Sequence, residues 1–200
     1  DRDLPPASKI HPVKHQESMP LEELQEKLNC LYPANTRTKQ AILFTILTAS
    51  RVGESVPARW DEIDWENRIW SVPPERRKDQ KPYPHRVPLS DQAIELLKSI
   101  EKKGDHIFGV SEESLGSRYT LTKLLKRLTG TTATMHGFRS TFRDWAAENG
   151  VPDIVAEKCL MHTTGNAVVQ AYQRSDLLEQ RREVMQQWAD AVFSGVSSAA

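Results

Sequence analysis

The sequence predicts a mostly α-helical domain that carries one small antiparallel β-sheet. In most of the chain, apolar residues recur at intervals of three and four, which is the period of an amphipathic helix. Between residues 61 and 90 this period gives way to short β-branched and aromatic runs separated by turn-forming residues, a pattern typical of strands. With 200 residues, of which 38% are hydrophobic and 27% charged, the chain is long enough for one domain with its own core.

Two helices are predicted in the N-terminal third. Residues 1–18 are polar and rich in proline, and we expect them to be a linker into the domain from a longer protein. Residues 19–31 place Leu21, Leu24 and Leu28 on one helical face, with Pro20 in the first turn. Residues 36–50 are apolar nearly all round, which predicts a central helix that carries Arg51 at its C-terminal end.

The sheet is predicted from residues 61–74 and 85–90. The first segment, "DEIDWENRIWSVPP", reads as two strands with a turn at Glu66 and Asn67, and "HRVPLS" reads as a third strand. The connection between the second and third strands places Lys78 and Lys81 near a hairpin tip.

The C-terminal half is predicted to be helical again. Its expected helices are residues 90–104 with Ser90 as N-cap and Gly104 as the stop, 120–130 ended by Gly130, 135–150 ended by Gly150, 151–162 with Pro152 in the first turn, and 177–193. The last of these carries an apolar stripe of Val184, Trp188 and Val192. Two interpretations of the stripe stay open: packing on its own domain, or docking on a partner protomer.

Composition excludes several classes of protein. The longest apolar run, Ala41 to Ala49, is too short to span a membrane and reads as a buried helix. Cys30 and Cys159 form no disulfide framework, so a reducing cytoplasm is the expected compartment. No Cys, His or carboxylate cluster has metal-ligand spacing, and no glycine-rich phosphate loop is present, so we expect neither a metal nor another cofactor.

Charge is balanced overall but unevenly distributed. The 27 basic and 27 acidic residues cancel, yet residues 114–143 contain no Asp or Glu, and a second basic stretch covers residues 76–86. One basic face on a neutral body suits a phosphate-bearing partner, whereas an ordinary solvated helix surface is the alternative. The candidate contacts are Arg76, Arg77, Lys81, Lys123, Lys126, Arg127 and Arg143.

Two clusters have the chemistry to hold a phosphate. His136 and Arg139 are three residues apart at the start of a predicted helix, where unpaired N–H groups already favour anions. Arg51 follows a buried helix and needs a partner or a ligand; Glu54 is its expected partner, and both interpretations can hold together. Tyr172 is flanked by apolar residues, so on its own it reads as a packing residue.

Four segments taken together resemble the catalytic boxes of the tyrosine recombinases, and more narrowly the integrases of temperate phages and genomic islands. These segments are "TASRVGE", "HGFRST", "LMH" and "AYQRSD", in this order, and the similarity extends from about Met19 to Phe193. The resemblance implies a tyrosine recombinase catalytic domain at residues 19–200, with residues 1–18 as a linker from a missing N-terminal DNA-binding region. The implied catalytic residues are Arg51, Lys78, His136, Arg139, His162 and Tyr172, with Glu54 in support.

The roles implied by the resemblance are those of a DNA strand-breaking and rejoining enzyme. Tyr172 would be the nucleophile that forms a 3′-phosphotyrosyl link, and Lys78 the hairpin lysine that protonates the leaving 5′ oxygen. Two departures stand out: the hairpin is longer than expected, so Lys81 is an alternative to Lys78, and Met161 occupies a position where a small residue is expected. The implied partners are double-stranded DNA, further copies in a recombinase tetramer and a host DNA-bending factor; the implied setting is a mobile element in a bacterial nucleoid.

Three rival functions remain at this point. A DNA-binding module of the same fold would retain DNA without a covalent product. A type IB topoisomerase-like enzyme would relax plasmids without a site requirement. A helical protein–protein domain would bind DNA, if at all, independently of Arg51 and Arg139.

Overall fold

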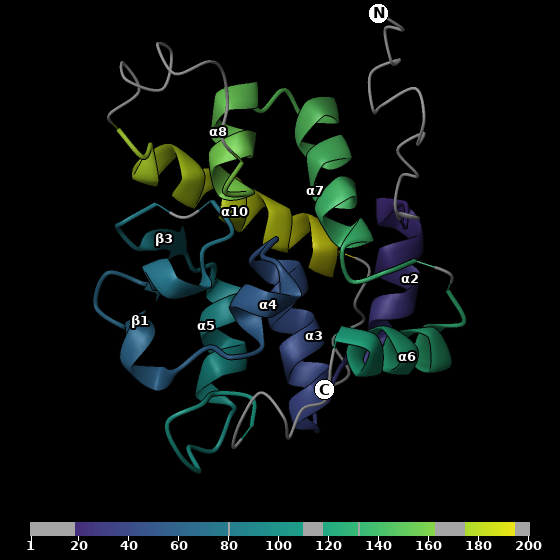
Figure 1. The fold of residues 1–200 in the computed structure, drawn as a ribbon. Helices are drawn as coiled ribbons and strands as arrows, with labels where there is room; N and C mark the ends of the chain where they lie inside the picture. Colours follow the sequence, from purple (N-terminus) through teal and green to yellow (C-terminus); the bar gives the residue numbers. More distant parts are fainter. Residues whose placement is uncertain (1–18, 80, 110–117, 132, 163–174, 195–200) are drawn as a thin grey trace, which may run out of the picture.

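The fold is mostly helical with a three-stranded antiparallel sheet, as the sequence predicts (Figure 1). The computed structural model describes residues 19–79, 81–109, 118–131, 133–162 and 175–194. In the N-terminal half the elements are α2 (Leu21–Leu31), α3 (Arg37–Leu47), α4 (Val52–Ser55), the 3₁₀ turn η1 (Trp60–Glu62), β1 (Ile63–Asp64), β2 (Ile69–Val72), the 3₁₀ turn η2 (Pro74–Arg76) and β3 (His85–Pro88). In the C-terminal half they are α5 (Asp91–Lys98), α6 (Arg118–Thr129), α7 (Gly137–Glu148), α8 (Asp153–Cys159) and α10 (Leu178–Phe193).

The sheet has the order β1–β2–β3 and lies at one edge of the helical body. Trp70 on β2 pairs with Ile63 on β1 and with Val87 on β3. The Trp70 ring is fully buried and packs against Phe44 of α3 with 5.0 Å between ring centroids. The sheet is therefore attached to the central helix through its middle strand.

The central position predicted for residues 36–50 is confirmed by α3. All eight residues from Gln40 to Leu47 are buried, so α3 has no solvent-facing side in this stretch. Thr36 caps the helix by accepting a hydrogen bond from the N–H of Lys39.

The last helix packs into its own domain. In Figure 1, α10 crosses the molecule between α7 and α8 on one side and α3 and α5 on the other. Val184, Trp188 and Val192 are all buried, and the Trp188 indole N–H donates to the carbonyl of Ile46 at 2.8 Å. Of the two interpretations of this stripe, the structure supports packing within the domain, because the residues are already covered.

Four sequence-based boundaries are wrong. The helix predicted to run to Gly104 ends at Lys98. Pro20 and Pro152 lie at N-cap positions instead of within the first turn. The helix predicted to carry Arg51 ends at Leu47, because Ala49 adopts a positive φ of 47° and turns the chain.

Candidate catalytic site

Arg51 lies at the start of the single-turn helix α4, where it is paired with Glu54. The Arg51 backbone N–H donates to Glu54 Oε2 and its Nη1 donates to Glu54 Oε1, both at 2.9 Å. This is a capping-box arrangement, in which the third residue of a helix reaches back to the N-cap. Glu54 is 3% exposed and the Arg51 side chain 19%, so the carboxylate holds both the backbone and the guanidinium of Arg51 while the side chain stays partly accessible. The predicted pairing is confirmed.

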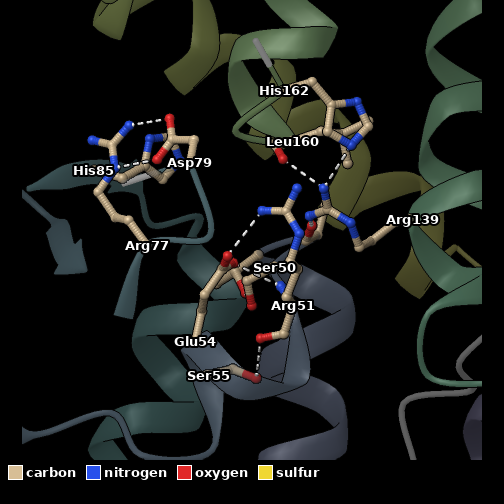
Figure 2. A network of polar contacts seen from close by, with 12 residues as sticks. Ser50, Arg51, Glu54, Ser55, Arg77, Asp79, His85, Arg139, Leu160 and His162 are labelled. Atoms are coloured by element: carbon tan, nitrogen blue, oxygen red, sulfur yellow. Dashed lines mark hydrogen bonds and ion pairs between the residues drawn. The ribbon is translucent and has the colours of Figure 1, made fainter. Parts of the chain in front are cut away.

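Arg139 is a buried cation held by carbonyl oxygens. It is 4% exposed, and its Nη1 donates to the carbonyl of Ala49 at 2.6 Å while Nη2 donates to the carbonyl of Leu160 (Figure 2). Within the described part of the chain, no carboxylate contacts this guanidinium and its Nε has no hydrogen-bond partner. Burial, and secondarily the Arg51 charge, lower the pKa of Arg139 to about 10.

Both carbonyls that hold Arg139 belong to turns with a left-handed residue. Ala49 has φ 47°, and Met161, directly after Leu160, has φ 53°. A residue with a Cβ carries a cost of about 1–2 kcal/mol in this conformation. Such strain is often found near functional sites, where surrounding contacts maintain it. The left-handed conformation of Met161 also gives a physical reason for expecting a small residue at this position, because glycine, which has no Cβ, adopts it without this cost.

His162 completes the support of Arg139. Its Nε2 lies 3.0 Å from Arg139 Nη2, and its Nδ1 lies 2.7 Å from Glu157 Oε2. Burial and the adjacent Arg139 charge lower the pKa of His162, against the opposing effect of Glu157. Because a guanidinium can only donate, Nε2 accepts, and the neutral ring carries its proton on Nδ1 and donates it to Glu157.

His136 is the N-cap residue of α7, and its exposed ring makes no capping hydrogen bond. Partial burial lowers the pKa of His136, and the charges of Arg139, Arg51 and Lys78 lower it further. The ring is therefore within electrostatic reach of all three cations. Arg51 and Arg139 also face one another, with their guanidinium groups side by side in Figure 2.

The two hairpin lysines occupy different surroundings. Lys78 is exposed, and its charge lowers the pKa of His136, whereas the charge of Lys81 lowers the pKa of Asp79. Lys78 is thus the hairpin lysine whose charge reaches a predicted catalytic residue.

The residues expected to contact a phosphate backbone divide into two groups. Three of the expected DNA contacts, Arg76, Arg77 and Arg143, are engaged in ion pairs. Arg76 bonds Glu62, Arg77 bonds Asp79, and Arg143 bonds both Asp153 and Glu157. Arg77 is also buried and donates to the carbonyl of Tyr83. Lys123, Lys126 and Arg127 are exposed on α6, at the edge of the molecule (Figure 1).

Sequence reasoning missed three residues near the site. Glu157 lies five positions before His162, which is too common a spacing to be a signal. His85 on β3 is enclosed, and burial, followed by the charges of Arg181 and other arginines, lowers its pKa well below 6.5. Arg181 on α10 is 1% exposed and lies in line with Met185 and Trp188, a position on the apolar stripe that could have marked it as buried.

The predicted nucleophile, Tyr172, lies outside the described residues. The chain that follows it is attached to the site region: the carbonyl of Ser175 accepts a hydrogen bond from Lys158, and Asp176 Oδ2 accepts from Arg86 Nε at 2.9 Å and Nη2 at 2.6 Å.

Neither a membrane span nor a metal cluster is found in the described ranges. No helix there has both the length and the apolar character needed to cross a bilayer. No group of three or more His, Cys, Asp or Glu side chains there is arranged to hold a metal ion.

Comparison with known proteins gives consistent matches. The family model described as "Phage integrase family" matches residues 17–179. The prophage integrase IntA of Escherichia coli K12 is 35% identical over 187 residues, which are 90% of this chain and 45% of that protein. The integrase of mycobacterium phage Brujita superposes with a TM-score of 0.69 at 18% identity, covering 94% of this chain and 66% of that one. The Tn1549 transposon integrase, in complex with circular intermediate DNA, gives 0.55 at 16% identity, covering 89% and 68%. The chain thus spans about half the length of the curated relatives that it matches.

Proposed function

Because this chain belongs to the phage integrase family, we propose that it is the catalytic part of a site-specific DNA recombinase. The enzyme cleaves and rejoins DNA through a 3′-phosphotyrosyl intermediate, for integration or excision of a mobile element. The observation that carries the proposal is the meeting of Arg51 and Arg139, whose guanidinium groups lie side by side in Figure 2 and whose charges, together with that of Lys78, act on His136.

Such a cluster is suited to a phosphodiester. The fall in the pKa of Arg139 to about 10 corresponds to about 3 kcal/mol of unfavourable interaction for the charged form. An anion placed between Arg139 and Arg51 offsets this cost and gains charge-assisted hydrogen bonds. Since the described contacts of Arg139 are carbonyls and a neutral imidazole, a phosphate does not have to displace a competing carboxylate there.

The same charges favour the transition state over the bound substrate. When the Tyr172 oxygen attacks phosphorus, the P–O5′ bond breaks, a 3′-phosphotyrosine forms and a 5′-hydroxyl is released. Negative charge grows on the non-bridging oxygens during attack, where fixed guanidinium groups stabilise it. The reverse attack of a 5′-hydroxyl rejoins a strand and returns the tyrosine, so no external energy source is required.

Proton transfer is assigned to the exposed groups. The leaving 5′ oxygen needs a proton, and we assign its donation to Lys78, an exposed lysine on the β2–β3 connection whose charge acts on His136. Ionising the Tyr172 phenol at neutral pH costs about 4 kcal/mol from its reference pKa near 10, and in the proposed reaction cations brought next to the phenol lower that cost.

The partners follow from the reaction. Double-stranded DNA is the substrate, and exchange of strands between two duplexes calls for further copies of the chain in a tetramer, with a host DNA-bending factor as an accessory. The solved Tn1549 integrase complex with DNA supports the choice of DNA as the partner. The site of action is then the bacterial nucleoid.

A trapping experiment tests the function. The full-length protein is incubated with a duplex that carries its element's attachment sequence and a nick beside the cleavage position, so that the cleaved end diffuses away and the covalent product accumulates. We expect a protein–DNA adduct whose modified peptide contains Tyr172, and no adduct with Tyr172→Phe.

The chain offers matched controls and clear contrary outcomes. Tyr32→Phe and Tyr83→Phe remove the hydroxyls of two exposed tyrosines and should leave the adduct intact. Absence of an adduct from the full-length wild type, with DNA still bound, would favour a binding module. Relaxation of plasmids that lack the attachment sequence would favour a topoisomerase-like enzyme.

A further inference from the structure

Glu157 contacts His162 at two points. The His162 backbone N–H donates to the carbonyl of Glu157 at 2.9 Å, and His162 Nδ1 lies 2.7 Å from Glu157 Oε2. Both residues belong to the end of α8 and the turn after it, where Met161 adopts its left-handed conformation. The ring and the carboxylate are therefore connected through backbone and side chain together.

The second oxygen of Glu157 is also occupied. Arg143 Nε donates to Glu157 Oε1 at 2.9 Å, and Arg143 Nη2 donates to Asp153 Oδ1 at 3.0 Å. Glu157 is 19% exposed on its side chain, whereas Asp153 is 83% exposed. The carboxylate of Glu157 is thus held in one orientation by Arg143, on the adjacent helix α7, and its free choice of rotamer is reduced.

We propose that Glu157 is a positioning residue, which fixes His162 in the Nδ1–H tautomer with its Nε2 directed at Arg139. The consequence for catalysis rests on the proposed function, but the orientation itself does not. The chain of contacts runs from Arg143 through Glu157 and His162 to Arg139, and it joins α7 and α8.

The alternative tautomer is unfavourable at both ends of the ring. With its proton on Nε2, His162 would direct a donor at the Nη2 donor of Arg139, and its bare Nδ1 would face the Glu157 carboxylate. The charged groups that act on the ring are Glu157 from α8, Arg139 from α7 and Arg51 from the turn before α4, and His136 lies near it at the start of α7. Glu157 is the sole anion in that set, and it favours protonation, whereas the arginines oppose it.

The test is the protonation chemistry of His162 in this chain, measured by NMR on protein labelled at histidine nitrogens. His162→Gln assigns the signal among the six histidines. In wild type we expect the Nδ1–H tautomer when the ring is neutral. In Glu157→Gln, which keeps the shape and removes the charge, we expect the pKa of His162 to fall and the tautomer preference to weaken. Glu157→Asp retains the charge and should give a pKa between those of Glu157→Gln and wild type.

Asp153→Asn is the matched control. It removes a carboxylate from the same helix, α8, that contacts Arg143 but not His162. It should therefore leave the pKa and the tautomer of His162 unchanged. If Glu157→Gln leaves both at their wild-type values, or if Asp153→Asn changes them equally, the proposal is overturned.

The trapping assay separates this inference from the proposed function. With the full-length protein, Glu157→Gln should reduce the rate of adduct formation, and the acid limb of the pH–rate profile should move in the direction of the His162 pKa. A wild type that forms no adduct contradicts the proposed function and leaves the NMR result to decide the role of Glu157. A normal adduct rate together with an unchanged His162 signal in Glu157→Gln contradicts the positioning role alone.

Discussion

Replacement of Arg139 by lysine should cost far more than a change of one cation for another suggests. The guanidinium donates to the carbonyl of Ala49 from one nitrogen, and to the carbonyl of Leu160 and to His162 from the other. Lysine keeps the charge but has a single nitrogen, so it cannot span these acceptors on two separate turns. Arg139→Lys therefore leaves at least one buried acceptor without a donor.

The size of the effect follows from these contacts. An orphaned buried carbonyl costs about 1–3 kcal/mol, and loss of the charge-assisted bond to His162 adds to it, so we expect a destabilisation of about 3 kcal/mol. For a chain of this length, 1 kcal/mol lowers the melting temperature by about 2–4 °C, which gives a fall of about 6–12 °C. Adduct formation should be lost as well, because the lysine cannot present a planar pair of donors to the phosphate.

Thermal unfolding followed by circular dichroism measures the fall in melting temperature. Arg127→Lys, the same replacement at an exposed position of α6, should change the free energy of unfolding by less than about 0.5 kcal/mol. If Arg139→Lys melts within about 2 °C of wild type, the guanidinium does not hold the two turns together and the reasoning is wrong.

Three further predictions concern the surroundings of the site. Glu54→Gln should lower the free energy of unfolding in urea by about 2 kcal/mol, since Arg51 loses its charged partner; an effect no larger than that of Asp61→Asn, an exposed carboxylate, would contradict this. Burial lowers the pKa of His85 well below 6.5, so on acidification His85 is protonated in the unfolded state before it is protonated in the folded state. The contribution of neutral His85 to the free energy of unfolding is therefore full above about pH 6.5 and decreases as the pH falls below that value. His85→Gln should flatten that decline in unfolding measured from pH 7 to 5, and an unaltered slope would refute the assignment. Met161→Gly and Met161→Ala remove the same buried side chain, but glycine relieves the left-handed strain and should be the more stable by about 0.5–1 kcal/mol; the reverse order in urea unfolding would count against strain at this turn.

Much of the fold could be predicted because the periodic signals are strong and local. The stripe of Phe138, Phe142 and Trp145 defines α7, and positive φ at Gly130 and Gly150 ends the helices where the sequence indicates. The turn after α3 could not be predicted, because alanine is not a residue type that favours the left-handed conformation. The conformation of Ala49 is maintained by a hydrogen bond from Arg139, 90 residues further along the chain.

The residues of the candidate site also fall into those that local sequence signals predict and those that they do not. The spacing of His136 and Arg139 on one helix is a local feature and was predicted from the sequence alone. The meeting of Arg51 with Arg139 came from resemblance to a family, because no local rule brings these positions together. The ion pairs of Arg77 and Arg143 were missed, since an arginine's choice among nearby carboxylates depends on the three-dimensional arrangement.

The central position of α10 has a consequence for how the protein folds during translation. The Trp188 ring packs against Phe142 and Trp145 of α7, while its N–H reaches the carbonyl of Ile46 in α3, so one side chain connects early and late parts of the polypeptide. A nascent chain released before residue 188 emerges has an open cavity where that ring belongs. We therefore expect the arginine cluster to assemble only after α10 has been translated, so that the proposed DNA cleavage depends on that helix having emerged.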